Sequence, residues 1–272
     1  SKRALAVKGT GYDFNSSMVE IYRNLTNHMP DNGMQIVMFT HQNVKVWAEL
    51  ALILWSANLR VTAAWNIATE TDSGGLKAGN YVKGTVLLVL RKQTSEKTVF
   101  EDELYPEIEE EVKQQIDNMR KLDDKEDPNF NDADYLLAAY ASSLKVLTSY
   151  KNIEGINVQH ELSKDRGKSS EPSPVEKLIH SAVKIAYDYL IPKGFDSFIW
   201  RTFAPFERFF IKGLEMEKQG STQLSIFQEL ARGYGVNNYK EMLANTKANK
   251  ARLKTASEFK MSGMQSDEFK AS

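Results

Sequence analysis

The fold is decided by one stretch, LRVTAAWNIATETDSGGLKAGNYVKGTVLLVLRK (residues 59–92), in which two apolar runs flank a long polar loop. Residues 59–68 and 85–92 are rich in branched and apolar side chains and predict two strands. A connection between parallel neighbours needs a crossover of about a dozen residues or more, usually helical. The loop 69–84 has no helical periodicity. We therefore predict that the second strand runs antiparallel to its companions and closes the sheet as a β-hairpin.

The residues before this stretch predict the rest of an α/β unit. A helix begins near Ser16 and stops at the turn Pro30-Asp31-Asn32-Gly33. The apolar run MQIVMFT (34–40) predicts a central strand covered on both faces. A second helix is predicted over residues 44–58. The fold class is therefore α/β, the trailing half of a doubly wound sheet.

Beyond Gln93 the periodicity becomes helical. Ser173-Pro174-Val175-Glu176 has the pattern of a capping box with proline at the first helical position. The predicted helices cover residues 101–122, 132–150, 174–190, 222–232 and 237–247. We predict an amino-terminal segment (1–15), half a sheet (16–92), a helical domain (93–250) with a flexible linker near 163–174, and a mobile tail (251–272).

Composition excludes several classes of protein. The 272 residues are 42% apolar and 26% charged, with a net charge of -1, so no global basic field indicates nucleic-acid binding. No run approaches the roughly 18 apolar residues that a membrane span needs. The absence of cysteine excludes disulfides and thiolate chemistry and predicts a cytoplasmic location. The four histidines lack ligand spacing, so no metal is expected. The missing initial Met and the polar end predict a fragment, a split subunit or a processed chain.

A succession of motifs carries a resemblance to a known family. A proline-glycine turn leads to a strand ending Thr-His, then a helix with an inward Trp, a strand ending near Trp-x-x-x-Thr-Glu, and a last strand ending in Arg. The residues are Gly33, Thr40, His41, Trp47, Trp65, Thr69, Glu70 and Arg91. This succession resembles the adenine-specific DNA methylases of prokaryotic modification and phage-defence loci. The resemblance covers residues 16–150, and more faintly residues 151–250.

The resemblance implies a partial Rossmann-like methyltransferase sheet with a reversed last strand, followed by an α-helical domain. It also implies S-adenosylmethionine as cofactor and DNA as partner. The family's glycine-rich cofactor loop and Asp-Pro-Pro-Tyr loop hold the cofactor and the flipped adenine. No Pro-Pro pair is present, and Asp127-Pro128-Asn129-Phe130 follows no apolar strand. Lys8-Gly9-Thr10-Gly11 is not followed by a strand ending in an acidic residue.

We therefore expect both signatures in a missing upstream segment or in a second chain, and we assign no catalytic residue here. The chain alone is predicted to be inactive. An alternative is a non-catalytic DNA-binding or assembly subunit that retains half the fold, and a third is an unrelated helical protein with an α/β cap. A homo-oligomer is left open.

The candidate contacts for substrate or DNA follow the strand ends, where open α/β sheets bind ligands. They are His41, Gln42, Asn66, Glu70, Lys77, Asn80 and Lys83. For His41 the alternative is a polar residue at the start of a helix that Thr40 or Asn43 caps. For the loop 69–84 the alternative is a plain mobile hairpin loop.

Two further patterns in the helical half have competing interpretations. The segment SFIWRTFAPFERFF (197–210) interleaves aromatic and basic residues, which is typical of base stacking beside a basic groove but also, and preferably, of a buried helix with solvated basic residues. FQELARGYGVNNYKEML (227–243) has the Ala-to-Gly spacing of a helix-turn-helix, although Glu241 falls where an apolar residue is expected.

Overall fold

The computed structural model describes residues 11–41, 43–68, 84–122, 130, 132–164, 171–192, 194–220, 222–246 and 249–259. The chain divides into two compact units. Of the described residues, the first unit contains those up to residue 186 except 132 and 133. The second contains residues 132 and 133 and those from residue 187 onward. Each unit is considered by itself.

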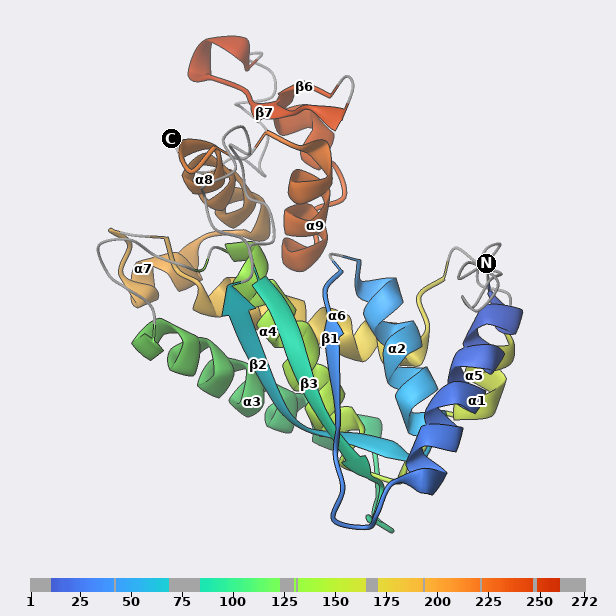
Figure 1. The fold of residues 1–272 in the computed structure, drawn as a ribbon. Coiled ribbons are helices and arrows are strands. Elements are labelled where there is room, and N and C mark those ends of the chain that lie inside the picture. The colour runs from blue at the N-terminus through green and yellow to red at the C-terminus, as the bar shows by residue number, and fades with distance from the viewer. Residues whose placement is uncertain are drawn as a thin grey trace. The chain divides into compact units, whose positions relative to one another are not determined.

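The first unit is built on a three-stranded sheet with the order β1-β3-β2 (Figure 1). Its strands are β1 (Gln35–Phe39), β2 (Leu59–Ala68) and β3 (Gly84–Lys92). Strand β3 pairs antiparallel with both neighbours, in registers that place Val37 opposite Leu88 and Trp65 opposite Leu87. The predicted reversal of the last strand is confirmed. Strand β3 lies between β1 and β2, which run parallel to each other.

The structure contradicts one expectation from the sequence, which concerns strand β1. It was predicted to be covered on both faces, yet in the described chain it is an edge strand with alternating burial. The side chains of Ile36 and Met38 are 59% and 61% exposed, and Trp65 on β2 is 57% exposed. The register places Ile36 opposite Val89, and Met38 opposite Leu87, which itself faces Trp65. These residues therefore share one face of the sheet, which we call the open face.

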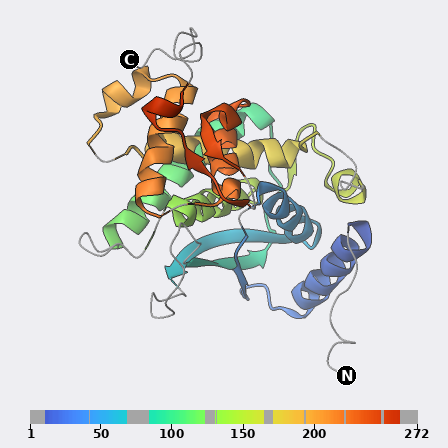
Figure 2. The ribbon, with the colours of Figure 1, turned by 90° about the horizontal axis from the view of Figure 1, so that it is seen from above.

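Helices cover the other face of the sheet (Figure 2). They are α2 (Val44–Ser56), α3 (Glu101–Leu122) and α4 (Asp132–Leu147). Trp47 of α2 is fully buried and meets Phe39 of β1 edge-on at 4.8 Å and Tyr140 of α4 at 5.5 Å. On the same face Val86, Leu88 and Leu90 are fully buried, so the core lies between β3 and these helices.

The remaining elements of the first unit flank this core. They are α1 (Tyr12–His28), the parallel pair β4 (Thr98–Val99) and β5 (Asn152–Ile153), α5 (Val158–Ser163) and α6 (Pro174–Tyr189), whose last turn enters the second unit. The hydroxyl of Ser173 accepts from the backbone N–H of Glu176 at 3.0 Å, so the predicted start of α6 is confirmed. In α3 the side chains of Leu104, Ile108, Val112, Ile116 and Met119 are buried, whereas Leu122, the last residue of the helix, is exposed.

The second unit contains α7 (Ser197–Thr202), α8 (Pro205–Lys218), α9 (Leu224–Tyr234) and an antiparallel pair, β6 (Leu243–Asn245) with β7 (Arg252–Leu253). The helix predicted over 237–247 is wrong. Gly235 ends α9 in the left-handed conformation, and only a short 3-10 helix, η3 (Tyr239–Met242), follows before β6. No second helix of the helix-turn-helix forms, so that interpretation is wrong as well. Part of the predicted tail is ordered, as β7 and the 3-10 helix η5 (Ala256–Glu258).

Candidate functional site

His41 lies at the carboxyl end of β1, where the sequence placed it, and its side chain is exposed. Its Nδ1 accepts from the backbone N–H of Asn43 at 3.0 Å, and its carbonyl accepts from Nε1 of Trp47 at 2.7 Å. Asn43 in turn caps α2, because its side chain accepts from the N–H of Lys45 at 2.8 Å. The imidazole thus takes part in the start of α2 and remains exposed.

Asn66 lies near the carboxyl end of β2, at the same edge of the sheet. Its Nδ2 donates to the carbonyl of Asp134 at 2.8 Å, and its Oδ1 is buried without a hydrogen-bond partner among the described residues. A buried amide oxygen with no donor is unfavourable. Asn66 is therefore a sequence-predicted candidate whose side-chain oxygen is buried and has no hydrogen-bond partner among the described residues.

Asp134 is a residue that the sequence analysis missed. It is fully buried in the first turn of α4, and its Oδ1 accepts from the N–H of Gly84 at 2.9 Å. The hydroxyl of Thr40 donates to the carbonyl of Gly84 at 3.4 Å. Asp134 thus joins the end of β2, through Asn66, to the start of β3, and the hydroxyl of Thr40 joins the start of β3 to the end of β1. An acidic residue at a helix start was the only signal for it.

The other predicted candidates, Gln42, Glu70, Lys77, Asn80 and Lys83, lie outside the described residues, as do residues 69–83 of the loop that carries four of them. Of the seven candidates the structure therefore places two. His41 and Asn66 lie at the same edge of the sheet because β1 and β2 run parallel.

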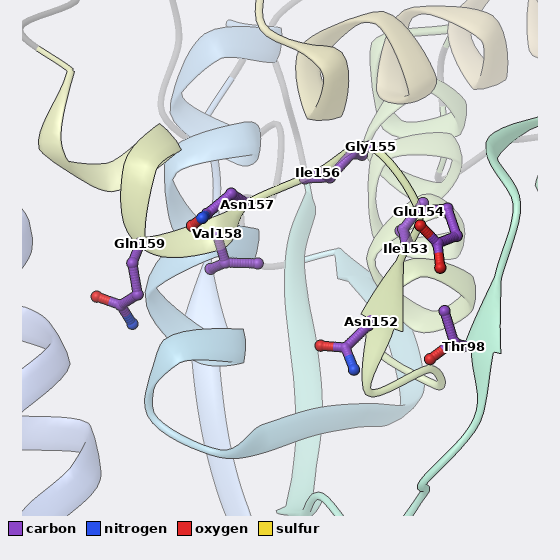
Figure 3. Close-up of a pocket in the computed structure, with 9 residues that line it drawn as sticks. All are labelled: Thr98, Asn152, Ile153, Glu154, Gly155, Ile156, Asn157, Val158 and Gln159. Atoms are coloured by element: carbon purple, nitrogen blue, oxygen red, sulfur yellow. The ribbon is translucent and has the colours of Figure 1, made fainter.

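A pocket of about 670 Å³ lies near the opposite edge, where β3 ends (Figure 3). It is lined by one continuous segment and one residue of β4: Thr98, Asn152, Ile153, Glu154, Gly155, Ile156, Asn157, Val158 and Gln159. Glu154 is the only titratable side chain among them. Asn157 already caps α5 by accepting from the N–H of His160 at 3.0 Å. The pocket therefore lacks a pair of groups for acid–base chemistry.

The aromatic segment of the second unit (residues 197–210) contains both buried and exposed side chains. Trp200 and Phe209 are buried, as the preferred interpretation predicted, whereas Phe198 is 76% exposed. Arg208 fixes α7, because its guanidinium donates to the carbonyls of Trp200 and Arg201 and pairs with Asp188 at 2.8 Å. This arginine is committed to the fold.

The second unit also buries an ionic cluster. Nζ of Lys212, which is 3% exposed, lies 2.6 Å from Glu215 and 3.1 Å from Asp132. Burial lowers the pKa of Lys212, but the two carboxylates outweigh burial and leave that pKa raised. A buried lysine that is paired with two carboxylates is a structural ion pair.

Comparison with known protein families, with curated proteins and with solved structures found no match to the chain. Within the described ranges, no three His, Asp or Glu side chains are placed to share a metal ion. No helix in the part of the chain that the structure describes has both the length and the apolar character to cross a bilayer.

Proposed function

We propose that this chain forms the back half of an S-adenosylmethionine-dependent, adenine-specific DNA methyltransferase. It would contribute the trailing strands of a Rossmann-like catalytic sheet and a helical region for contact with DNA or with a partner. The cofactor loop and the Asp-Pro-Pro-Tyr loop would come from an upstream segment or a second chain. By itself the chain would not methylate DNA.

The observation that carries this proposal is the sheet topology. Strand β3 is reversed and pairs with two strands that run parallel to each other. A reversed last strand is the feature that the resemblance predicts for the end of a methyltransferase sheet. The three runs of sequence that carry the resemblance, from Met34 to Arg91, lie side by side in this sheet.

A second observation supports the proposal that this sheet is part of a larger one. Apart from Gln35, the run from Met34 to Phe39 is apolar, which suits a strand inside a larger sheet. In the described chain its outer edge is unpaired and its open-face side chains are more than half exposed. Exposed apolar side chains beside an unpaired strand edge are a liability in water, and a further part of the sheet would remove it.

The role proposed for the carboxyl ends of β1 and β2 follows from the directions of these two strands. Ligands of open α/β sheets bind beyond the carboxyl ends of parallel strands. His41 and Asn66 lie at that end of β1 and β2. In the assembled enzyme, we expect His41 to contact the extruded base or a DNA phosphate. Asn66 would use its free Oδ1 to accept from a group of the complementary segment.

One observation is compatible with the alternative of a non-catalytic assembly subunit. Asp134, the acidic residue of this edge that is described, is committed to the backbone of Gly84. A carboxylate that holds the fold together at this end of the strands is as compatible with a scaffold as with an enzyme.

Calorimetric titration with S-adenosylmethionine tests the proposal. We expect no binding by this chain alone, and binding by the polypeptide extended to the start of its reading frame, or by a complex with the product of the adjacent frame. Adenine methylation should accompany binding. Tight cofactor binding by residues 1–272 alone would contradict the fragment hypothesis, and an assembled protein that binds no cofactor would favour the assembly subunit.

A further inference from the structure

Two arginine side chains lie opposite each other where β2 begins and β3 ends (Figure 1). The register pairs Arg60 of β2 with Arg91 of β3, so both side chains lie on the same face of the sheet. That face is the open face, because Arg91 follows Val89 by two residues on β3. Like charges directly opposite each other in a sheet are destabilising. An anion between the two guanidinium groups would remove this repulsion.

A bulge in β2 creates the arginine pair. The register shifts between Val61 and Ala63, which leaves Thr62 as an extra residue on β2. Without the extra residue Arg60 would point to the helix-covered face, because a shift of one residue moves a side chain to the other face of the sheet. The bulge therefore brings Arg60 to the open face and places it beside Arg91.

The guanidinium of Arg60 has no acidic partner among the described residues. Its side chain is half-buried, and its Nε is buried without a hydrogen-bond acceptor in the same part of the chain. A buried donor without an acceptor and a half-buried charge without a counter-ion are both unfavourable. The oxygen atoms of an anionic ligand would satisfy the donor and the charge together.

Arg91 is held in place by the turn that precedes β1. Its Nη1 donates to the carbonyls of Asn32 and Gly33 at 2.9 and 3.4 Å. The carboxylate of this turn, Asp31, pairs with Lys92 at 2.9 Å and not with Arg91. Because a guanidinium has five N–H donors on three nitrogens, donors of Arg91 remain beyond the one nitrogen that binds the turn.

From these contacts we infer that Arg60 and Arg91 bind a phosphate monoester, such as the terminal phosphate of a nucleotide. The planar donor group of arginine matches phosphate oxygens with paired hydrogen bonds. A phosphate monoester carries a charge of about -1.5 to -2 at pH 7, which balances two arginines, whereas each phosphodiester of DNA carries one negative charge. The site lies at the end of the strands opposite to His41 and Asn66, so it does not depend on the proposed function.

Contacts with neighbouring segments fix the backbone beneath the two arginines. The N–H of Val61 donates to the hydroxyl of Thr148, in the segment after α4, at 2.8 Å. The N–H of Gln93 donates to the carbonyl of Asn58 at 2.9 Å, just beyond the paired residues. A site whose backbone is already ordered loses less conformational freedom when it binds a ligand.

Calorimetric titration of residues 1–272 with inorganic phosphate and with adenosine 5′-monophosphate tests the site, with adenosine as the probe that lacks a phosphate. We expect both phosphates to bind and adenosine not to bind. Arg60→Met removes the guanidinium and keeps an apolar stem, so it should weaken the binding of both phosphates by at least about tenfold. Arg201→Met removes an exposed arginine of α7 and should leave phosphate binding unchanged.

Urea denaturation with phosphate, compared with chloride at equal ionic strength, gives a second measurement. A ligand that binds the folded state raises the free energy of unfolding, so phosphate should stabilise the parent chain and not Arg60→Met. If Arg60→Met fails to fold, Arg60→Lys replaces it. Lysine keeps the charge without the planar donor group, and this variant should also bind both phosphates more weakly.

Three results would overturn the inference. They are no binding of either phosphate by the parent chain, equal affinities of the parent and the Arg60 variant, and equal affinities for adenosine and its monophosphate. A DNA duplex without terminal phosphates is the last probe. If this duplex binds through Arg60 and inorganic phosphate does not bind, the site belongs to a nucleic-acid backbone and the monoester assignment is wrong. S-adenosylmethionine carries no phosphate, so the cofactor titration tests the proposed function separately.

Discussion

The carboxylate of Asp134 accepts a hydrogen bond from the backbone N–H of Gly84 at 2.9 Å, across 50 positions of sequence. Asp134 is fully buried, and its carbonyl also accepts from the side chain of Asn66. The two contacts attach α4 to the end of β2 and the start of β3. The hairpin that defines this sheet therefore depends on a residue of the next helical segment.

Removing this carboxylate should destabilise the first unit. In Asp134→Ala the buried N–H of Gly84 loses its acceptor, and we expect the free energy of unfolding to fall by about 1 to 3 kcal/mol. Urea denaturation followed by circular dichroism measures the change. The matched control is Glu110→Ala on the exposed surface of α3, for which a change within about 0.5 kcal/mol is expected. Equal stabilities of the two variants would contradict the role of Asp134.

His41 and Asn43 separate a structural role from a functional one at the end of β1. Asn43→Ala removes the cap of α2 and should cost about 0.5 to 2 kcal/mol of stability. His41→Ala leaves that cap in place, so we expect it to be less destabilising and, if the proposed function holds, to weaken DNA binding by the assembled protein. Denaturation and DNA titration are measured on both variants. If His41→Ala loses stability without losing DNA affinity, the imidazole serves only the start of α2.

The local patterns of the sequence predicted most of the first unit. The apolar run of residues 85–92 and the lack of helical periodicity in the preceding loop 69–84 were enough to place β3 and its direction. The apolar run around Ile36 could not distinguish a central strand from an edge strand, since that distinction depends on which strands are present beside it. In the structure β1 is an edge strand, and one of its faces is exposed rather than covered.

Other features depend on contacts between residues distant in sequence. Asp134 was missed because its partner, Gly84, is remote and the sequence shows only an acidic residue at the start of a helix. The helix predicted over 237–247 has apolar residues at plausible spacing. Instead, Leu243 pairs with Leu253 in β6 and β7, so strand pairing prevails over a weak helical pattern. Residues 69–83, with four of the candidate contacts, lie outside the described residues.

The buried ion pair of Lys212 should be important to the second unit. Lys212→Met removes the buried cation that contacts Asp132 and Glu215, and breaking a buried pair costs about 3 to 5 kcal/mol. Adding Asp132→Asn to this variant should restore part of the loss, because one uncompensated charge is removed. The control is Lys218→Met on the exposed side of α8, with a loss below about 1 kcal/mol. A loss as small for Lys212→Met as for this control would show that the pair contributes little.

The buried position of Glu229 predicts that the stability of the second unit depends on pH. Burial raises the pKa of Glu229 above its ordinary value of 4.5, and the nearby Arg232, at 2.5 Å, lowers it by less. Its Oε2 is buried without a hydrogen-bond partner among the described residues. Because the folded-state pKa is the higher one, the folded protein is favoured by the protonated carboxyl. That stability is complete below pH 4.5 and is lost as the pH rises through the folded-state value.

Glu229→Gln does not titrate, so this variant should be more stable than the parent chain at pH 7. The difference should shrink toward zero as the pH falls below 4.5. Urea denaturation at a series of pH values from 4 to 7 measures it, with the exposed Glu241→Gln as a surface control for the substitution itself. A Gln variant that is less stable than the parent at pH 7 would mean that the ion pair with Arg232 outweighs the burial of the carboxylate.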